Sequence, residues 1–203
     1  MRTGGTGGAN TNRTGLKFEN CLRRHQNGER YIINDITFLY LEKGRLARYL
    51  PKHEYEKDLQ PDASYINEET KTIYILEYKN QITPGSTDEK IQTGPFKLKK
   101  YAKRYPDYTF YFAYVLSEWW FNRKDYKDDI EILKESDIEI FWGKIKVQTP
   151  DMQQDHTEQM NDLVVELVVR AGKIETKKIY PREYETDFDL IDSWMTRQVL
   201  QSS

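Results

Sequence analysis

The chain has 203 residues, of which 37% are hydrophobic and 13% aromatic, which is enough apolar mass for one folded domain. Its 31 Lys and Arg nearly balance 33 Asp and Glu, and the net charge of −2 argues against a uniformly basic nucleic-acid-binding surface. One Cys excludes an internal disulfide and a cysteine-based zinc site, and the apolar runs fall short of the ~18 residues of a membrane helix. With no apolar leader at the N-terminus, we expect a soluble cytoplasmic protein without membrane association.

Charge is distributed unevenly along the chain. Residues 1–104 contain 19 Lys and Arg against 13 Asp and Glu, a net charge of +6. Residues 105–203 contain 12 against 20, a net charge of −8. This asymmetry favours an anionic partner for the first half, although solvated faces alone can also produce it.

The N-terminal third is expected to contain an arm, a helix and two strands. Residues 1–12 include four glycines and few groups that could pack, which predicts a flexible arm. Residues 14–25 have helical periodicity, with Phe18 and Leu22 among the apolar positions. Residues 31–50 alternate loosely, which predicts two strands around a turn at Lys43-Gly44.

The next unit is predicted to be a β-hairpin. Residues 61–67 and 72–79 are both typical of strands, and a four-residue polar loop connects them. If Asn67 and Thr72 close the loop, Asp62 lies directly opposite Glu77. Both faces of these strands are largely apolar, so we expect them inside a sheet that is covered on both sides.

The middle of the chain alternates between helix and strand. The sequence Ser86-Thr87-Asp88-Glu89 is a capping box that predicts a helix start, and Gly94-Pro95 begins a second helical segment. Further elements are expected as a buried strand over 108–116, a helix over 125–135 and a short strand over 137–142.

After residue 150 the sequence changes character. Apolar residues from Met160 to Val168 stand at helical spacing, although their many valines leave a strand open. Residues 187–200 predict a terminal helix. We therefore divide the chain into a flexible arm over 1–12, a core over 13–149 and an extension over 150–203 that packs on the core.

The predicted hairpin carries the candidate chemistry. Asp62 and Glu77 lie across from each other, with Cβ atoms about 4.5–5.5 Å apart, and alternation places Lys79 on the same face as Glu77. Two carboxylates this close repel each other unless a cation lies between them. Mg²⁺ prefers such oxygen ligands, and a neighbouring Lys could orient or deprotonate an attacking water, so the pattern is suited to phosphodiester hydrolysis.

The segment Pro61-Asp62, fourteen intervening residues and Glu77-Tyr78-Lys79 resembles the PD-(D/E)xK nuclease superfamily, in particular the type II restriction endonucleases. The stretch from Arg13 to Glu19, Gln81 and the stretch 85–90 add to the resemblance, which covers about residues 13–142. It implies an α/β fold with a restriction-endonuclease-like core, in which helices flank a central mixed sheet.

The resemblance also implies an activity and a site. The expected enzyme is a Mg²⁺-dependent endodeoxyribonuclease of a restriction-modification system, with Mn²⁺ as a substitute metal and no nucleotide cofactor. The expected metal ligands are Asp62, Glu77 and the Tyr78 carbonyl oxygen, and Lys79 assists the nucleophile. Glu19 precedes the first strand on a helix, where it either contacts the metal or its water or forms an ordinary i,i+4 pair with Arg23.

The expected partner is double-stranded DNA, and a palindromic site would call for a homodimer. Basic or polar residues that could contact DNA are Arg13, Lys17, Lys52, Gln81, Lys90, Lys97, Lys100, Lys103 and Arg104. The basic helix from Lys97 to Arg104 could instead present an ordinary solvated face, and Gln81 could merely order the site. A repair, recombination or mobile-element nuclease and a non-catalytic DNA-binding module on the same scaffold remain alternatives.

Overall fold

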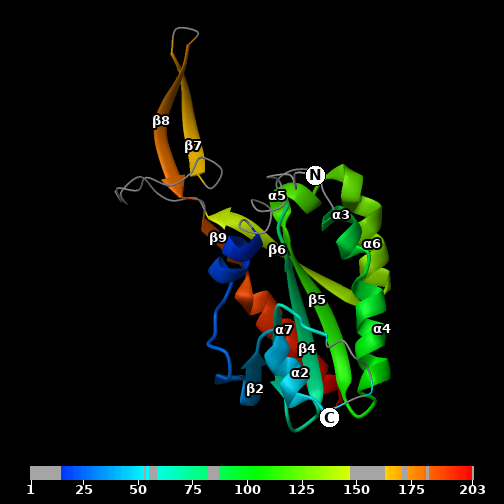
Figure 1. Cartoon of the computed structure of the whole chain (residues 1–203). Helices are drawn as coiled ribbons and strands as arrows, with labels where there is room; N and C mark the ends of the chain where they lie inside the picture. The colour runs from blue at the N-terminus through cyan, green and yellow to red at the C-terminus, as the bar shows by residue number, and fades with distance from the viewer. Residues whose placement is uncertain are drawn as a thin grey trace, which may run out of the picture.

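The structure is a computed structural model that describes residues 15–52, 54, 59–81, 87–146, 163–170, 173–181 and 183–202. It has an α/β architecture in which helices lie on both faces of a mixed seven-stranded sheet (Figure 1). The strands of this sheet are β1 (Arg30–Ile33), β2 (Ile36–Leu41), β3 (Ala63–Asn67), β4 (Thr72–Lys79), β5 (Thr109–Ser117), β6 (Ile138–Lys146) and β9 (Glu183–Thr186). The helices are residues 15–21, α2 (Gly44–Tyr49), α3 (Thr87–Ile91), α4 (Gly94–Arg104), α5 (Glu118–Phe121), α6 (Lys127–Glu135) and α7 (Phe188–Ser202), with a 3₁₀ turn at Lys124–Tyr126.

The strand order of the sheet is β1-β2-β3-β4-β5-β6-β9. Strands β4, β5 and β6 are parallel to one another, and the remaining pairs are antiparallel. The parallel pairs need crossover connections, and α4 and α6 supply them. The predicted α/β class is therefore confirmed, as are the predicted hairpin and the strand before α5.

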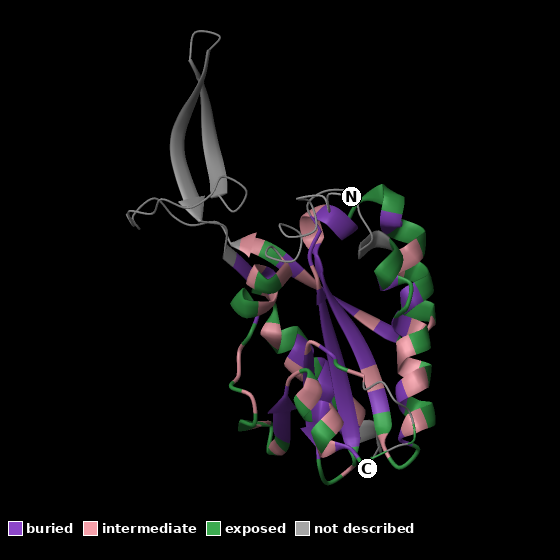
Figure 2. Cartoon of the chain, viewed as in Figure 1, coloured by how far each residue is buried: buried purple, intermediate pink, exposed green. Residues whose placement is uncertain are grey.

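The sheet is packed on both faces, as the apolar patterns of β4 and β5 predict (Figure 2). On one face, Tyr101 of α4 and Leu133 of α6 join a core with Ile75, Phe112 and Ile140. The opposite face is covered by α7 and by the segment that contains the helix at 15–21. Phe18 and Leu22 of that segment and Ile191, Trp194 and Met195 of α7 are buried there. The central strands are consequently rigid supports for whatever their ends carry.

Two local predictions are wrong. The turn after the first strand lies at Asn34-Asp35 rather than at Lys43-Gly44. Asn34 and Asp35 have positive φ angles of 49° and 64°. Asn and Asp tolerate this left-handed conformation, which two-residue hairpin turns require. Residues 44–49 then form α2 instead of a second strand, because Leu46 is buried in the core on the α4 side of the sheet.

The chain after residue 150 contributes to the sheet and also forms a separate hairpin. β9 pairs antiparallel with β6, and α7 follows it, as predicted for residues 187–200. Of the two structures left open for Met160 to Val168, the helix is wrong and the strand is confirmed at 163–168, since β7 (Leu163–Arg170) and β8 (Lys173–Pro181) form a two-stranded sheet that extends away from the large one (Figure 1). The β-branched valines favour that extended conformation. The arm expected over 1–12 lies outside the described residues. Within the described ranges, no helix has the length and apolar character needed to span a membrane.

Candidate functional site

The β3–β4 hairpin brings Asp62 and Glu77 to one end of the sheet. Ala63 pairs with Leu76 and Asn67 with Thr72, which is the register expected from the sequence. Asp62 precedes the first pair and thus lies across from Glu77. The backbone N–H of Tyr78 donates a hydrogen bond to Asp62 Oδ2 over 2.9 Å, which fixes the orientation of this carboxylate.

The ammonium group of Lys79 lies between the two carboxylates. Its Nζ is 2.8 Å from Glu77 Oε2, 3.2 Å from Asp62 Oδ2 and 3.1 Å from the carbonyl oxygen of Tyr78. Three oxygens from two strands therefore surround one positive charge. The hairpin register and the alternation of side chains predict that Asp62 lies across from Glu77 and that Lys79 shares the face of Glu77, whereas the contacts of the Lys79 ammonium group come from the structure.

A second lysine, Lys97 of α4, also reaches the site, with Nζ 2.9 Å from Glu77 Oε2. Gly94 allows α4 to come this close to the sheet, because a Cβ atom there would lie 2.8 Å from the ring of Tyr114. Tyr114 is the β5 neighbour of Glu77. The sequence groups Lys97 with the residues that could contact DNA, whereas in the structure its ammonium group contacts Glu77, one helical turn before the buried Tyr101.

Glu19 belongs to the same cluster. It does not pair with Arg23, which instead contacts Glu42 at 2.6 Å, and its own partner is Lys43, with Nζ 3.4 Å from Glu19 Oε2. Burial and repulsion from Asp62 raise the pKa of Glu19, and Lys43 opposes them. Phe18 anchors this helix against Gly143, where a Cβ atom would lie 2.3 Å from the Phe18 ring.

Lys43 was missed as a site residue. It has an unusual backbone conformation with φ 47° and ψ −126°, and its N–H donates to the carbonyl oxygen of Pro61 over 2.9 Å. Lys43 thereby ties the residue before Asp62 to the helix that carries Glu19. Nothing in the local sequence indicates this role, because it depends on where β2 ends relative to β3.

Charges in the site balance one another. Burial alone would raise the pKa of the Glu77 carboxyl, but the nearby ammonium groups of Lys79 and Lys97 outweigh it and hold that pKa below its ordinary value. Burial alone would lower the pKa of Lys79, and the carboxylates of Glu77 and Asp62 raise it instead. These carboxylates favour the ammonium form of Lys79, which can donate hydrogen bonds.

The oxygen atoms of the site fit a divalent metal with a preference for hard ligands. Asp62 Oδ2, Glu77 Oε2 and the Tyr78 carbonyl all lie within 3.2 Å of the Lys79 nitrogen, so they converge on a single cationic point. Two carboxylates and a carbonyl are the kind of partial oxygen set with which Mg²⁺ combines water and phosphate ligands. Among the described residues, no three His, Cys, Asp or Glu side chains form a group able to hold a metal.

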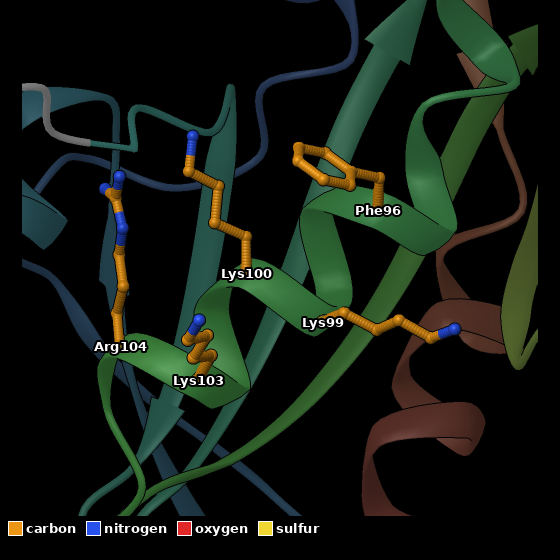
Figure 3. Close-up of a pocket in the computed structure, with 5 residues that line it drawn as sticks. All are labelled: Phe96, Lys99, Lys100, Lys103 and Arg104. Carbon is orange, nitrogen blue, oxygen red and sulfur yellow. The ribbon is translucent and has the colours of Figure 1, made fainter.

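The outer face of α4 forms a basic groove next to this site. The groove is lined by Phe96, Lys99, Lys100, Lys103 and Arg104 (Figure 3). Phe96, Lys100 and Arg104 point to the same side of the helix, whereas Lys99 points away from them. Phe96 is 68% exposed, and the ammonium group of Lys100 lies 5.8 Å from its ring centre. Lys97, which contacts Glu77, follows Phe96 directly on α4, so one helix carries both the groove residues and a residue of the carboxylate cluster.

The remaining DNA-contact candidates are dispersed. Arg13 lies outside the described residues, Lys17 is half-buried in the helix at 15–21, and Lys52 and Lys90 are exposed. Gln81 is buried just after the end of β4. Its backbone N–H donates to Ser117 Oγ over 3.1 Å, and its backbone carbonyl oxygen accepts from Trp119 Nε1 over 3.0 Å. Its burial favours the alternative in which Gln81 merely orders the site.

No protein-family model matches the chain, and neither the curated proteins nor the solved structures compared with it gave a match.

Proposed function

We propose that this protein is a Mg²⁺-dependent type II restriction endonuclease of the PD-(D/E)xK superfamily, which hydrolyses phosphodiester bonds of double-stranded DNA at a short specific sequence. The observation that carries the proposal is the convergence of Asp62, Glu77 and the Tyr78 carbonyl oxygen on the ammonium group of Lys79, which marks one cation-binding point between two carboxylates. A mixed sheet with helices on both faces, and with the hairpin β3–β4 at its centre, is the setting that the sequence resemblance implies.

Each residue of the site has a role in this chemistry. Asp62, Glu77 and the Tyr78 carbonyl would hold Mg²⁺, which when bound supplies charge neutralisation and a more acidic water. Lys79, as an ammonium group, donates hydrogen bonds that orient the attacking water and stabilise the negative charge that develops on the phosphate. Glu19 adds a carboxylate that can accept a hydrogen bond from water at the edge of the cluster.

The basic groove of α4 provides a path for the DNA backbone. Lys100, Lys103 and Arg104 extend along α4 from the end that carries Lys97, and DNA phosphates attract such side chains independently of sequence. The metal-site end and the groove together position a duplex so that one phosphate lies at the carboxylates. The acidic second half of the chain explains how a protein with a net charge of −2 can still bind DNA through one face.

Digestion of plasmid DNA in Mg²⁺ tests the proposal. The expected result is a set of discrete fragments that disappears in EDTA and in the variant Asp62→Asn. Smearing or structure-selective nicking would assign the site to a repair or recombination nuclease instead. DNA binding with no cleavage in Mg²⁺ or Mn²⁺ would overturn the enzymatic role and leave a non-catalytic DNA-binding module.

A homodimer is part of the proposal, because a two-fold symmetric recognition sequence is matched by a two-fold symmetric protein. Light scattering on the DNA-bound protein measures this directly. We expect two chains per duplex, and one chain per palindromic duplex would contradict the dimer.

A further inference from the structure

Three lysines and three carboxylates form one cluster, and only one of these lysines is required by the proposed chemistry. Lys43 pairs with Glu19, and Lys79 bridges Asp62 and Glu77. Lys97 makes a further contact with Glu77 Oε2, the same oxygen atom that Lys79 contacts. Glu77 thus has two ammonium partners at 2.8 and 2.9 Å, although one would neutralise it.

The second ammonium group competes with a divalent cation for Glu77. The side chain of Glu77 is 9% exposed, so water screens its neighbours poorly, whereas Lys97 is 30% exposed and can reach solvent. A unit charge about 4 Å from another in such a partly buried site changes an affinity by more than about tenfold. If Lys97 stayed in place, it would repel a cation that binds Glu77.

We propose that Lys97 is a positioning residue that holds Glu77 until DNA enters and then moves to a phosphate oxygen, so that cation binding and DNA binding are coupled. The inference rests on the proposed function and deepens it. The location of Lys97 allows the exchange, because its side chain is 30% exposed and it belongs to the same helix as the basic residues that line the groove. Lys79 is less exposed, at 17%, and its ammonium group contacts three oxygens of the hairpin.

The first experiment measures cation binding without DNA. Calorimetric titration of Mn²⁺ into the free protein is compared for wild type, Lys97→Gln and Lys97→Arg, with Asp62→Asn to identify binding at this site. We expect Lys97→Gln to bind Mn²⁺ about tenfold more tightly than wild type, because the competing charge is gone. Lys97→Arg keeps the charge and should behave like wild type. A purely structural role predicts the opposite result, weaker binding in Lys97→Gln, because Glu77 would lose its support.

The second experiment measures the coupling. Binding of fragmented plasmid DNA is compared in Ca²⁺ and in EDTA, and the ratio of the two affinities is the coupling factor, which is the same for either ligand. We expect this factor to fall about tenfold in Lys97→Gln. The matched control Lys103→Gln removes the same charge from the outer face of α4, and it should weaken DNA binding equally in both conditions and leave Mn²⁺ affinity unchanged.

The outcomes separate this inference from the function on which it rests. Equal or weaker Mn²⁺ binding by Lys97→Gln, with wild-type binding lost in Asp62→Asn, overturns the role of Lys97 and leaves the metal site standing. Failure of both wild type and Lys97→Gln to bind Mn²⁺ overturns the metal site and the inference together. Thermal unfolding of each variant establishes that the comparison is made between folded proteins.

Discussion

Replacing Lys79 with Met should destabilise the protein as well as inactivate it. The side chains of Lys79, Asp62 and Glu77 are 17%, 18% and 9% exposed, so the ammonium group neutralises carboxylates that are mostly shielded from water. Removing one partner of a buried ion pair typically costs about 3–5 kcal/mol. Each carboxylate keeps one donor, the Tyr78 N–H for Asp62 and the Lys97 ammonium for Glu77, which places the expected loss near ~3 kcal/mol.

Thermal and urea unfolding at pH 7 in EDTA measure this loss. For a chain of this size, ~3 kcal/mol corresponds to a decrease in Tm of about 6–12 °C. The control Lys103→Met removes an exposed ammonium group from α4 and should change stability by less than ~0.5 kcal/mol. Equal unfolding curves for Lys79→Met and wild type would mean that Lys79 does not neutralise the pair, and the account of the site would then be wrong.

Further predictions concern the approach of the helices and the titration of the site. Gly94→Ala places a methyl group against the ring of Tyr114, and we expect the free energy of unfolding in urea to fall by about 1–3 kcal/mol. Gly143→Ala should cost a similar ~1–3 kcal/mol through its clash with the ring of Phe18, measured in the same way, and the double variant with Phe18→Leu should recover part of it. Because the pKa of Glu77 is lowered in the folded protein, its ionised carboxylate stabilises the fold at pH values above the ordinary pKa of 4.5. This contribution is lost as the pH falls through the lowered pKa. Unfolding of Glu77→Gln should therefore depend less on pH below 5 than unfolding of wild type, and equal slopes would contradict the assigned charges.

The sequence predicted the centre of the fold well because the information there is local. Alternation and β-branched residues determine the strands at 63–67 and 72–79, and the length of the loop between them determines the register that opposes Asp62 and Glu77. The helix after Gly94 follows from Pro95 and from apolar spacing. The prediction failed for the turn and second strand within 31–50, where alternation is weak, and it left 160–168 undecided, where valine-rich spacing is compatible with a helix or a strand.

The sequence by itself therefore determined that Asp62, Glu77 and Lys79 lie close together, because they belong to one hairpin whose pairing follows from short-range pattern. Only the tertiary structure decided which other charges join them. Lys97 reaches Glu77 because Gly94 lets α4 pack tightly against β5, and Lys43 reaches Glu19 because the end of β2 lies beside Pro61. Contacts between residues far apart in the chain depend on how surfaces pack, and charge spacing along a sequence carries no record of that packing.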